Sequence, residues 1–200
     1  MRIKSHWFKA EAPKSAEDIA SAAAFIIWRV AQNALKTMRA AHFELPPGPQ
    51  YFAFLSEFLA FLTLGADRIA YRQKDAAWRV AFTTAAANRV GAILADNEAD
   101  LLGGEAPGEC KRRFVALVNA RSAECADLAW TDEGPEYGFL RFLAHRIADV
   151  MQDADKTWSI SQVIESEAPE AAETLVRGMA GLLDTTPRRR AGGAGAARGE

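Results

Sequence analysis

The sequence predicts an all-α fold, a single-domain bundle of six to seven helices around a central apolar helix at about residues 51–73. Three observations support this class. The stretch Tyr51–Tyr71 carries apolar residues on every side of a helical wheel, and such a helix must be buried on all sides. The flanking segments place hydrophobic residues at three- and four-residue steps, the period of an amphipathic helix. Breaks rich in proline and glycine separate these segments.

Length and charge set the domain organisation. The 200 residues suit one domain with tails. We divide the chain into an N-terminal arm (1–14), a helical domain (15–184) and a disordered Arg/Gly/Ala tail (185–200), because the tail contains no residue that forms a core. The arm mixes aromatic and basic residues, so it either docks on the body or touches an anionic surface or partner. The net charge of −2 argues against nucleic acid as a partner.

The first three helices have clear start and stop signals. Residues 15–41 open on a capping-box pattern, in which Asp18 takes the place of the usual Glu or Gln, and the proline-rich run 45–49 ends this helix. The central helix follows. Asp75 is positioned to cap a third helix, which the glycine pair at 103–104 terminates.

In the second half of the chain, the sequence predicts helices that are shorter than the first three. We expect a fourth helix at 108–129, a turn at 131–135 and a fifth helix at 136–152. A short sixth helix at 158–165 precedes a seventh at 169–183, which begins with a proline in its first turn.

Hydrophobicity and cysteine placement indicate the compartment. The apolar run at 51–66 is too short to span a membrane and is interrupted by Glu57, so we expect no membrane span. The N-terminus has no apolar run typical of a signal peptide. Cys110 and Cys125, on one helix, would lie about 22 Å apart, whereas a disulfide needs about 6 Å. Free thiols predict a reducing compartment, the cytoplasm.

Glu57 is the most informative single residue. A carboxylate inside an apolar helix is costly unless it is paired or protonated. One interpretation is a ligand pocket that Glu57 shares with Arg68 and Tyr71, which lie near the same helical stripe. Glu57 and Arg68 are about 16 Å apart along the helix, so a third group must connect them. The alternative is a structural ion pair with an arginine of a neighbouring helix, such as Arg29 or Arg89.

A second candidate site is a metal site on the fifth helix. His145 and Asp149 are four residues apart, so they share one helical face and can present two ligands. They lie opposite the apolar stripe of their helix, which favours the alternative of a salt-bridged surface pair. The Glu-x-x-His pairs of di-iron bundles do not occur in the sequence.

A third candidate is an anion site at the start of the fourth helix. Lys111, Arg112 and Arg113 lie in its first turn, where free backbone N–H groups attract anions. The alternative is a solvated turn whose charges pair with Glu105 or Glu109.

No motif in the sequence specifies a reaction or a cofactor. The sequence lacks a glycine-rich phosphate loop, G-x-S-x-G, H-E-x-x-H and C-x-x-C. We therefore interpret the chain as a non-catalytic ligand-binding or protein-interaction module with a small molecule as candidate ligand. It is expected to be a homodimer, because Phe142 lies on the polar side of its helix. One alternative is a metal- or small-molecule-dependent enzyme with a polar pocket near Glu57. The other, which the acidic body makes the least favoured, is a nucleic-acid or anionic-surface partner that acts through residues 188–190, residues 111–113 and the N-terminal arm.

Overall fold

The computed structural model describes residues 14–103 and 106–184 and confirms an all-α, single-domain bundle. The predicted tail at 185–200 and the arm at 1–14, apart from Lys14, lie outside these residues. A two-stranded hairpin, β1 (Trp130–Thr131) and β2 (Gly134–Pro135), lies between the fourth and fifth helices. The helices are α1 (Ala16–Ala40), α2 (Pro49–Tyr71), α3 (Ala76–Leu102), α4 (Pro107–Glu124), α5 (Tyr137–Val150), α6 (Lys156–Gln162) and α7 (Ala168–Leu183).

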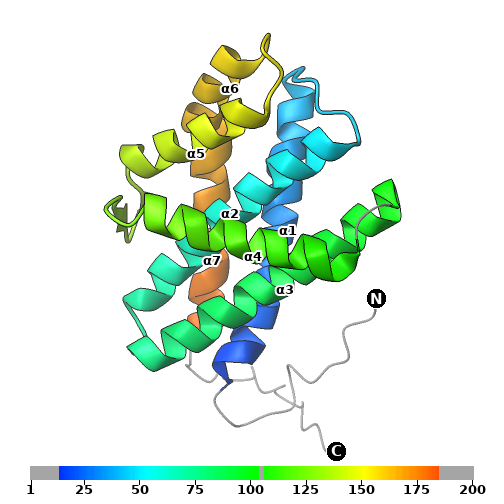
Figure 1. The fold of residues 1–200 in the computed structure, drawn as a ribbon. Helices are drawn as coiled ribbons and strands as arrows, with labels where there is room; N and C mark the ends of the chain where they lie inside the picture. The colour runs from blue at the N-terminus through cyan, green and yellow to red at the C-terminus, as the bar shows by residue number, and fades with distance from the viewer. Residues whose placement is uncertain (1–13, 104–105, 185–200) are drawn as a thin grey trace, which may run out of the picture.

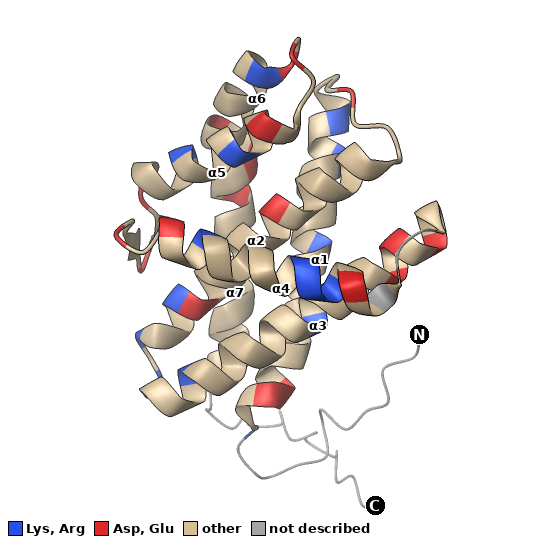
Figure 2. Cartoon of the chain, viewed as in Figure 1, with Lys and Arg blue, Asp and Glu red and all other residues tan. Residues whose placement is uncertain are grey.

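Helix α2 is the centre of the bundle, as predicted. It contacts α1, α3, α4, α5 and α7, and Figure 1 shows it between α3 and α4 on one side and α1 and α7 on the other. Phe54, Phe58 and Leu62 have no exposed surface. Each such side chain contributes about 1.5–3 kcal/mol through burial. Most of α2 is free of charge (Figure 2), so its few charged residues stand out as candidates for a special role.

The predicted helix ends have the expected local chemistry. The Ser15 hydroxyl accepts the Asp18 N–H and the Asp18 carboxylate accepts the Ser15 N–H, which completes a capping box at α1. The Asp75 carboxylate accepts the Trp78 N–H at 2.9 Å and caps α3. Gly103 ends α3 with φ 62°, a left-handed conformation that glycine adopts without strain.

Helix α4 is shorter than predicted, because the chain turns out of the helix and places Trp130 in the core. It ends at Glu124, and Trp130 in the following hairpin is 95% buried between Phe61 and Phe139. The Trp130 ring reaches the backbone of α2 at Gly65, where a Cβ atom would lie 2.4 Å from the ring. The absence of a side chain at Gly65 therefore makes this close approach between the hairpin and α2 feasible.

The last two predicted helices form one continuous helical run from Lys156 to Leu183. A π-helical segment, η2 (Val163–Glu167), joins α6 to α7, and the Ala168 N–H donates to the Val163 carbonyl five residues earlier. Pro169 has no N–H to donate, which weakens an α-helix at this point. The wider turn keeps the chain helical across the position where the sequence predicts a break.

Two further expectations are met within the described parts of the chain. At residues 14–103 and 106–184, none of the helices combines the length and hydrophobicity needed to cross a membrane. Cys110 and Cys125 are both buried, and no disulfide joins them, in agreement with the prediction.

Candidate functional site

Glu57 is engaged in a buried ion pair with an arginine of α4. Arg121 Nε donates to Glu57 Oε2 at 2.8 Å, and Arg121 Nη2 donates to Oε1 at 2.6 Å. The two side chains are 10% and 15% exposed. The hydrogen bonds to Glu57 raise the pKa of the Arg121 guanidinium. Both carboxylate oxygens of Glu57 thus have a donor from the protein itself.

The other two residues of the predicted pocket have separate partners. Arg68 Nη2 donates to the carbonyl oxygens of Cys125 and Ala126, each at 3.1 Å. Tyr71 is 64% exposed, and the guanidinium of Arg79 lies 4.8 Å from its ring centroid. The structure therefore places Glu57, Arg68 and Tyr71 in three different environments along α2 and does not bring them to one cavity.

A buried carboxylate that the sequence analysis did not single out lies one turn before Tyr71. Asp67 is 7% exposed and accepts two hydrogen bonds from Arg79, at 2.7 and 2.6 Å. The Thr83 hydroxyl donates a third at 2.6 Å. These bonds satisfy Asp67 and fix α3 on α2, so this cluster is structural.

The predicted metal pair lies on the outer face of α5. His145 and Asp149 are both exposed. Arg141 Nε donates to His145 Nε2 at 3.4 Å, and Arg146 pairs with Asp149 at 3.4 Å. Among residues 14–103 and 106–184, no three His, Cys, Asp or Glu side chains gather closely enough to hold a metal ion.

A chain of alternating charges connects Glu57 with Asp149. Arg121, which holds Glu57, also pairs with Glu124 at 2.9 Å, and Glu124 lies 3.7 Å from Arg146. Arg146 in turn pairs with Asp149. This network joins α2, α4 and α5, so two candidate sites of the sequence analysis belong to one set of structural ion pairs.

The basic triplet at the start of α4 is paired within the bundle. Arg112 forms an ion pair with Glu109 on the same turn, and Arg113 forms one with Glu98 of α3 at 2.9 Å. The aliphatic part of Lys111 lies against Gly91, where an added Cβ would meet it at 3.3 Å. Both arginines of the predicted anion site therefore have carboxylate partners.

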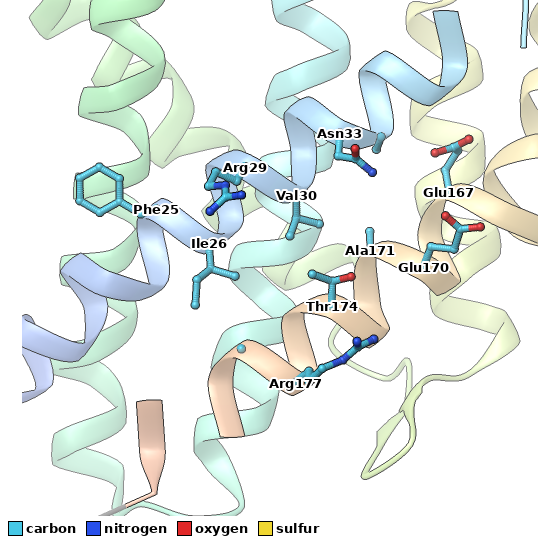
Figure 3. Close-up of a pocket in the computed structure, with 12 residues that line it drawn as sticks. Phe25, Ile26, Arg29, Val30, Asn33, Glu167, Glu170, Ala171, Thr174 and Arg177 are labelled. Atoms are coloured by element: carbon cyan, nitrogen blue, oxygen red, sulfur yellow. The ribbon is translucent and has the colours of Figure 1, made fainter. Parts of the chain in front are cut away.

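A large concave surface lies elsewhere, between α1 and α7. We call it the α1–α7 groove; it has a volume of about 700 Å³. Figure 3 shows its walls, with α1 on one side, α7 on the other and Glu167 and Glu170 together at one end. Its lining comprises Phe25, Ile26, Arg29, Val30, Asn33, Ala34, Glu167, Glu170, Ala171, Thr174, Arg177 and Gly178.

The two helices run antiparallel and approach each other closely at Gly178. A Cβ atom there would lie 3.0 Å from Ile26 Cδ1, so Ile26 packs directly over the glycine backbone. Val30 and Ala34 follow on the same face of α1, and Ala171 faces them from α7. The groove therefore has an apolar floor of small and medium side chains and polar residues on its rim.

Glu167 is the unusual residue of this groove. It ends the π segment, is only 2% exposed and accepts a hydrogen bond from Gln162 Nε2 at 3.0 Å. Burial raises the pKa of its carboxyl group, and the hydrogen bond from Gln162 only partly opposes this rise. Glu167 is therefore a buried carboxyl group whose environment favours its protonated form more than water does.

No signal in the sequence indicates this groove, because its carboxyl end depends on the π-helical segment. The predicted helices at 158–165 and 169–183 leave Glu167 between them, and the sequence did not single it out. The missing signal is the step of five from Val163 to Ala168, which keeps both residues on the buried side of one continuous helix. Arg29 appeared only as a potential partner of Glu57.

Comparison with known proteins adds no assignment to this geometry. No protein-family model matches the chain, and searches of curated proteins and of solved structures gave no match.

Proposed function

We propose that this protein is a non-catalytic binding protein and that the α1–α7 groove takes a small molecule with an apolar body. The buried carboxyl group of Glu167 in the groove wall carries this proposal. Burying a carboxyl group costs free energy, and groups with such perturbed pKa values cluster at functional sites. The volume of about 700 Å³ lies within the usual range of small-molecule sites.

Binding is favoured over catalysis by the state of the other carboxylates. The enzyme alternative needs a free polar group near Glu57, yet both Glu57 oxygens accept hydrogen bonds from Arg121. In the groove, no histidine or cysteine stands beside Glu167 among the lining residues to act as a nucleophile or second proton carrier. Two carboxyl groups at one end of an apolar floor, without such a partner, favour recognition over catalysis.

A neutral fluorescent probe tests this proposal. N-phenyl-1-naphthylamine consists of a phenyl ring and a naphthalene ring joined by an amine, and its fluorescence rises when it moves from water into an apolar site. We expect saturable binding with one probe per chain. Thr174 is exposed on the groove rim, so Thr174→Trp fills the groove without entering the core and is expected to weaken binding about tenfold or more.

The matched control is Gln32→Trp, which adds the same bulk to an exposed position of α1 outside the groove. It should leave the affinity for the probe unchanged. The proposal fails if the wild type does not bind the probe, or if both tryptophan variants bind it as well as the wild type does.

The expected cytoplasmic location and homodimeric state remain part of this proposal. The two buried thiols, which form no disulfide with each other, support a reducing compartment. Tyr137 and Trp158 are large apolar side chains that are 64% and 73% exposed, and they are candidate contacts between subunits. Sedimentation equilibrium over a range of concentrations tests the dimer, which a strict monomer at high concentration would exclude.

A further inference from the structure

The charges around the α1–α7 groove are unequally satisfied. Arg177 pairs with Glu173 at 2.7 Å, outside the groove. Glu170 accepts the Ser166 hydroxyl at 3.3 Å, and Glu167 accepts Gln162 as described above. Every charged lining residue except one therefore has a hydrogen-bond or ion-pair partner within the described parts of the chain.

The exception is Arg29. Its guanidinium has five N–H donors, and it makes no hydrogen bond or ion pair with any residue of 14–103 or 106–184. Asn33 lies one turn further along α1 on the same face, and its side-chain amide makes no hydrogen bond within these ranges either. Two adjacent turns of α1 thus present exposed hydrogen-bond donors to the groove that have no partner in the described parts of the chain.

A second arginine, which is not a lining residue of the groove, contacts Phe25 from α3. Arg89 of α3 stacks over the ring of Phe25, with 5.6 Å between its guanidinium carbon and the ring centroid. Its Nε atom is buried and has no hydrogen-bond partner, and no carboxylate of the described residues pairs with this side chain. Phe25 lines the groove at the end opposite Glu167 and Glu170 (Figure 3). Among the lining residues, Arg29 therefore lies toward the Phe25 end of the groove, and the two carboxyl groups lie at the other end.

We infer that the ligand of this groove is a small amphipathic anion whose charged group pairs with Arg29 while its apolar body lies on Ile26 and Val30. This inference rests on the proposed function and specifies its ligand. A guanidinium binds a carboxylate or sulfonate through two parallel N–H···O bonds, which are stronger than neutral hydrogen bonds. We place the charge of the ligand at Arg29, because Arg29 is the charged lining residue without a partner in the described parts of the chain. The two carboxyl groups at the other end, in contrast, accept hydrogen bonds from Gln162 and Ser166.

Two probes with the same aromatic skeleton separate the charge from the apolar body. The first, 8-anilinonaphthalene-1-sulfonate, is N-phenyl-1-naphthylamine with one added sulfonate group. We expect the sulfonate probe to bind the wild type more tightly than the neutral one. Arg29→Gln should weaken the sulfonate probe about fivefold or more, which is the loss of about 1 kcal/mol for one partly exposed ion pair, and should leave the neutral probe unchanged.

Lys36→Gln is the matched control, because it removes the same charge from an exposed position of α1 outside the groove. It should change neither affinity, whereas Arg29→Lys should retain part of the preference for the sulfonate. Both Arg29 and Lys36 are exposed, so these variants are expected to fold, and their thermal melts verify this.

The outcomes distinguish the two proposals. If the neutral probe binds in the groove and Arg29→Gln leaves the sulfonate probe unaffected, the inference of an anionic ligand is overturned and the binding site stands. If Lys36→Gln weakens the sulfonate probe as much as Arg29→Gln does, general surface charge explains the effect and the inference is likewise overturned. If the neutral probe does not bind at all, the proposed function itself fails.

Discussion

The pair of Glu57 and Arg121 gives the sharpest test of how this bundle is held together. Arg121→Met removes both hydrogen bonds to Glu57 and leaves a carboxylate that is 10% exposed inside the contact between α2 and α4. Breaking a buried pair in this way costs about 3–5 kcal/mol, because the remaining charge loses its partner and cannot regain water. That loss is a large share of the 5–15 kcal/mol by which domains of this kind are stable.

The double variant Glu57→Leu with Arg121→Met should behave differently. It replaces both charges by apolar groups of similar size, which is often neutral or stabilising, so we expect a free energy of unfolding within about 1 kcal/mol of the wild type or above it. Urea unfolding followed by circular dichroism measures both values. The single variant should also recover part of its stability at acid pH, since a buried carboxylate without a partner takes up a proton more readily.

Arg112→Met provides the control for this experiment. Arg112 also pairs with a glutamate, Glu109, but its side chain is 70% exposed. Exposed pairs contribute about 0–1 kcal/mol, so this variant should lose little. The reasoning is refuted if Arg121→Met and Arg112→Met lose the same amount, or if the double variant loses as much as Arg121→Met alone.

Two further predictions concern packing and pH. Gly65→Ala should lower the free energy of unfolding by about 1–3 kcal/mol, because its Cβ would lie 2.4 Å from the Trp130 ring. Gly178→Ala should change it by less than about 1 kcal/mol, because its Cβ would come no closer than 3.0 Å to Ile26 and a half-buried side chain can shift by the few tenths of an ångström required. Denaturation midpoints of both variants test this. The raised pKa of Glu167 means that the native state binds more protons than the unfolded state, so its contribution is fully present below the usual glutamate pKa and is lost as pH rises through the native value. Glu167→Gln should therefore stabilise the protein relative to wild type more at pH 7 than at pH 4, while Glu165→Gln, at an exposed position of the same segment, should show no such difference.

The fold was largely predictable because its strongest signals are local. The uniform hydrophobicity of Tyr51–Tyr71 could be satisfied only by burial on all sides, and the structure surrounds that helix. Caps such as Ser15 and Asp75 act through hydrogen bonds to residues three positions away, so they can be located without knowledge of the tertiary structure.

The sites were less predictable because they depend on which faces of different helices line the same space. The sequence indicated that Glu57 needs a partner and suggested Arg29 or Arg89, both of which lie on other helices than the actual partner, Arg121. Helical periodicity shows which residues share one face but not which face of another helix lies opposite. The same limit hid the α1–α7 groove, whose walls are about 140 residues apart in the chain.

The π segment has a consequence for how this chain can change in length. An α-helix turns by about 100° per residue, so the step of five between Val163 and Ala168 sets the rotational phase of everything that follows. Deleting one residue there would leave a more regular helix and yet turn Leu175 and Met179, both fully buried, away from the bundle. The packing of α7 on the bundle thus constrains the number of residues in this segment.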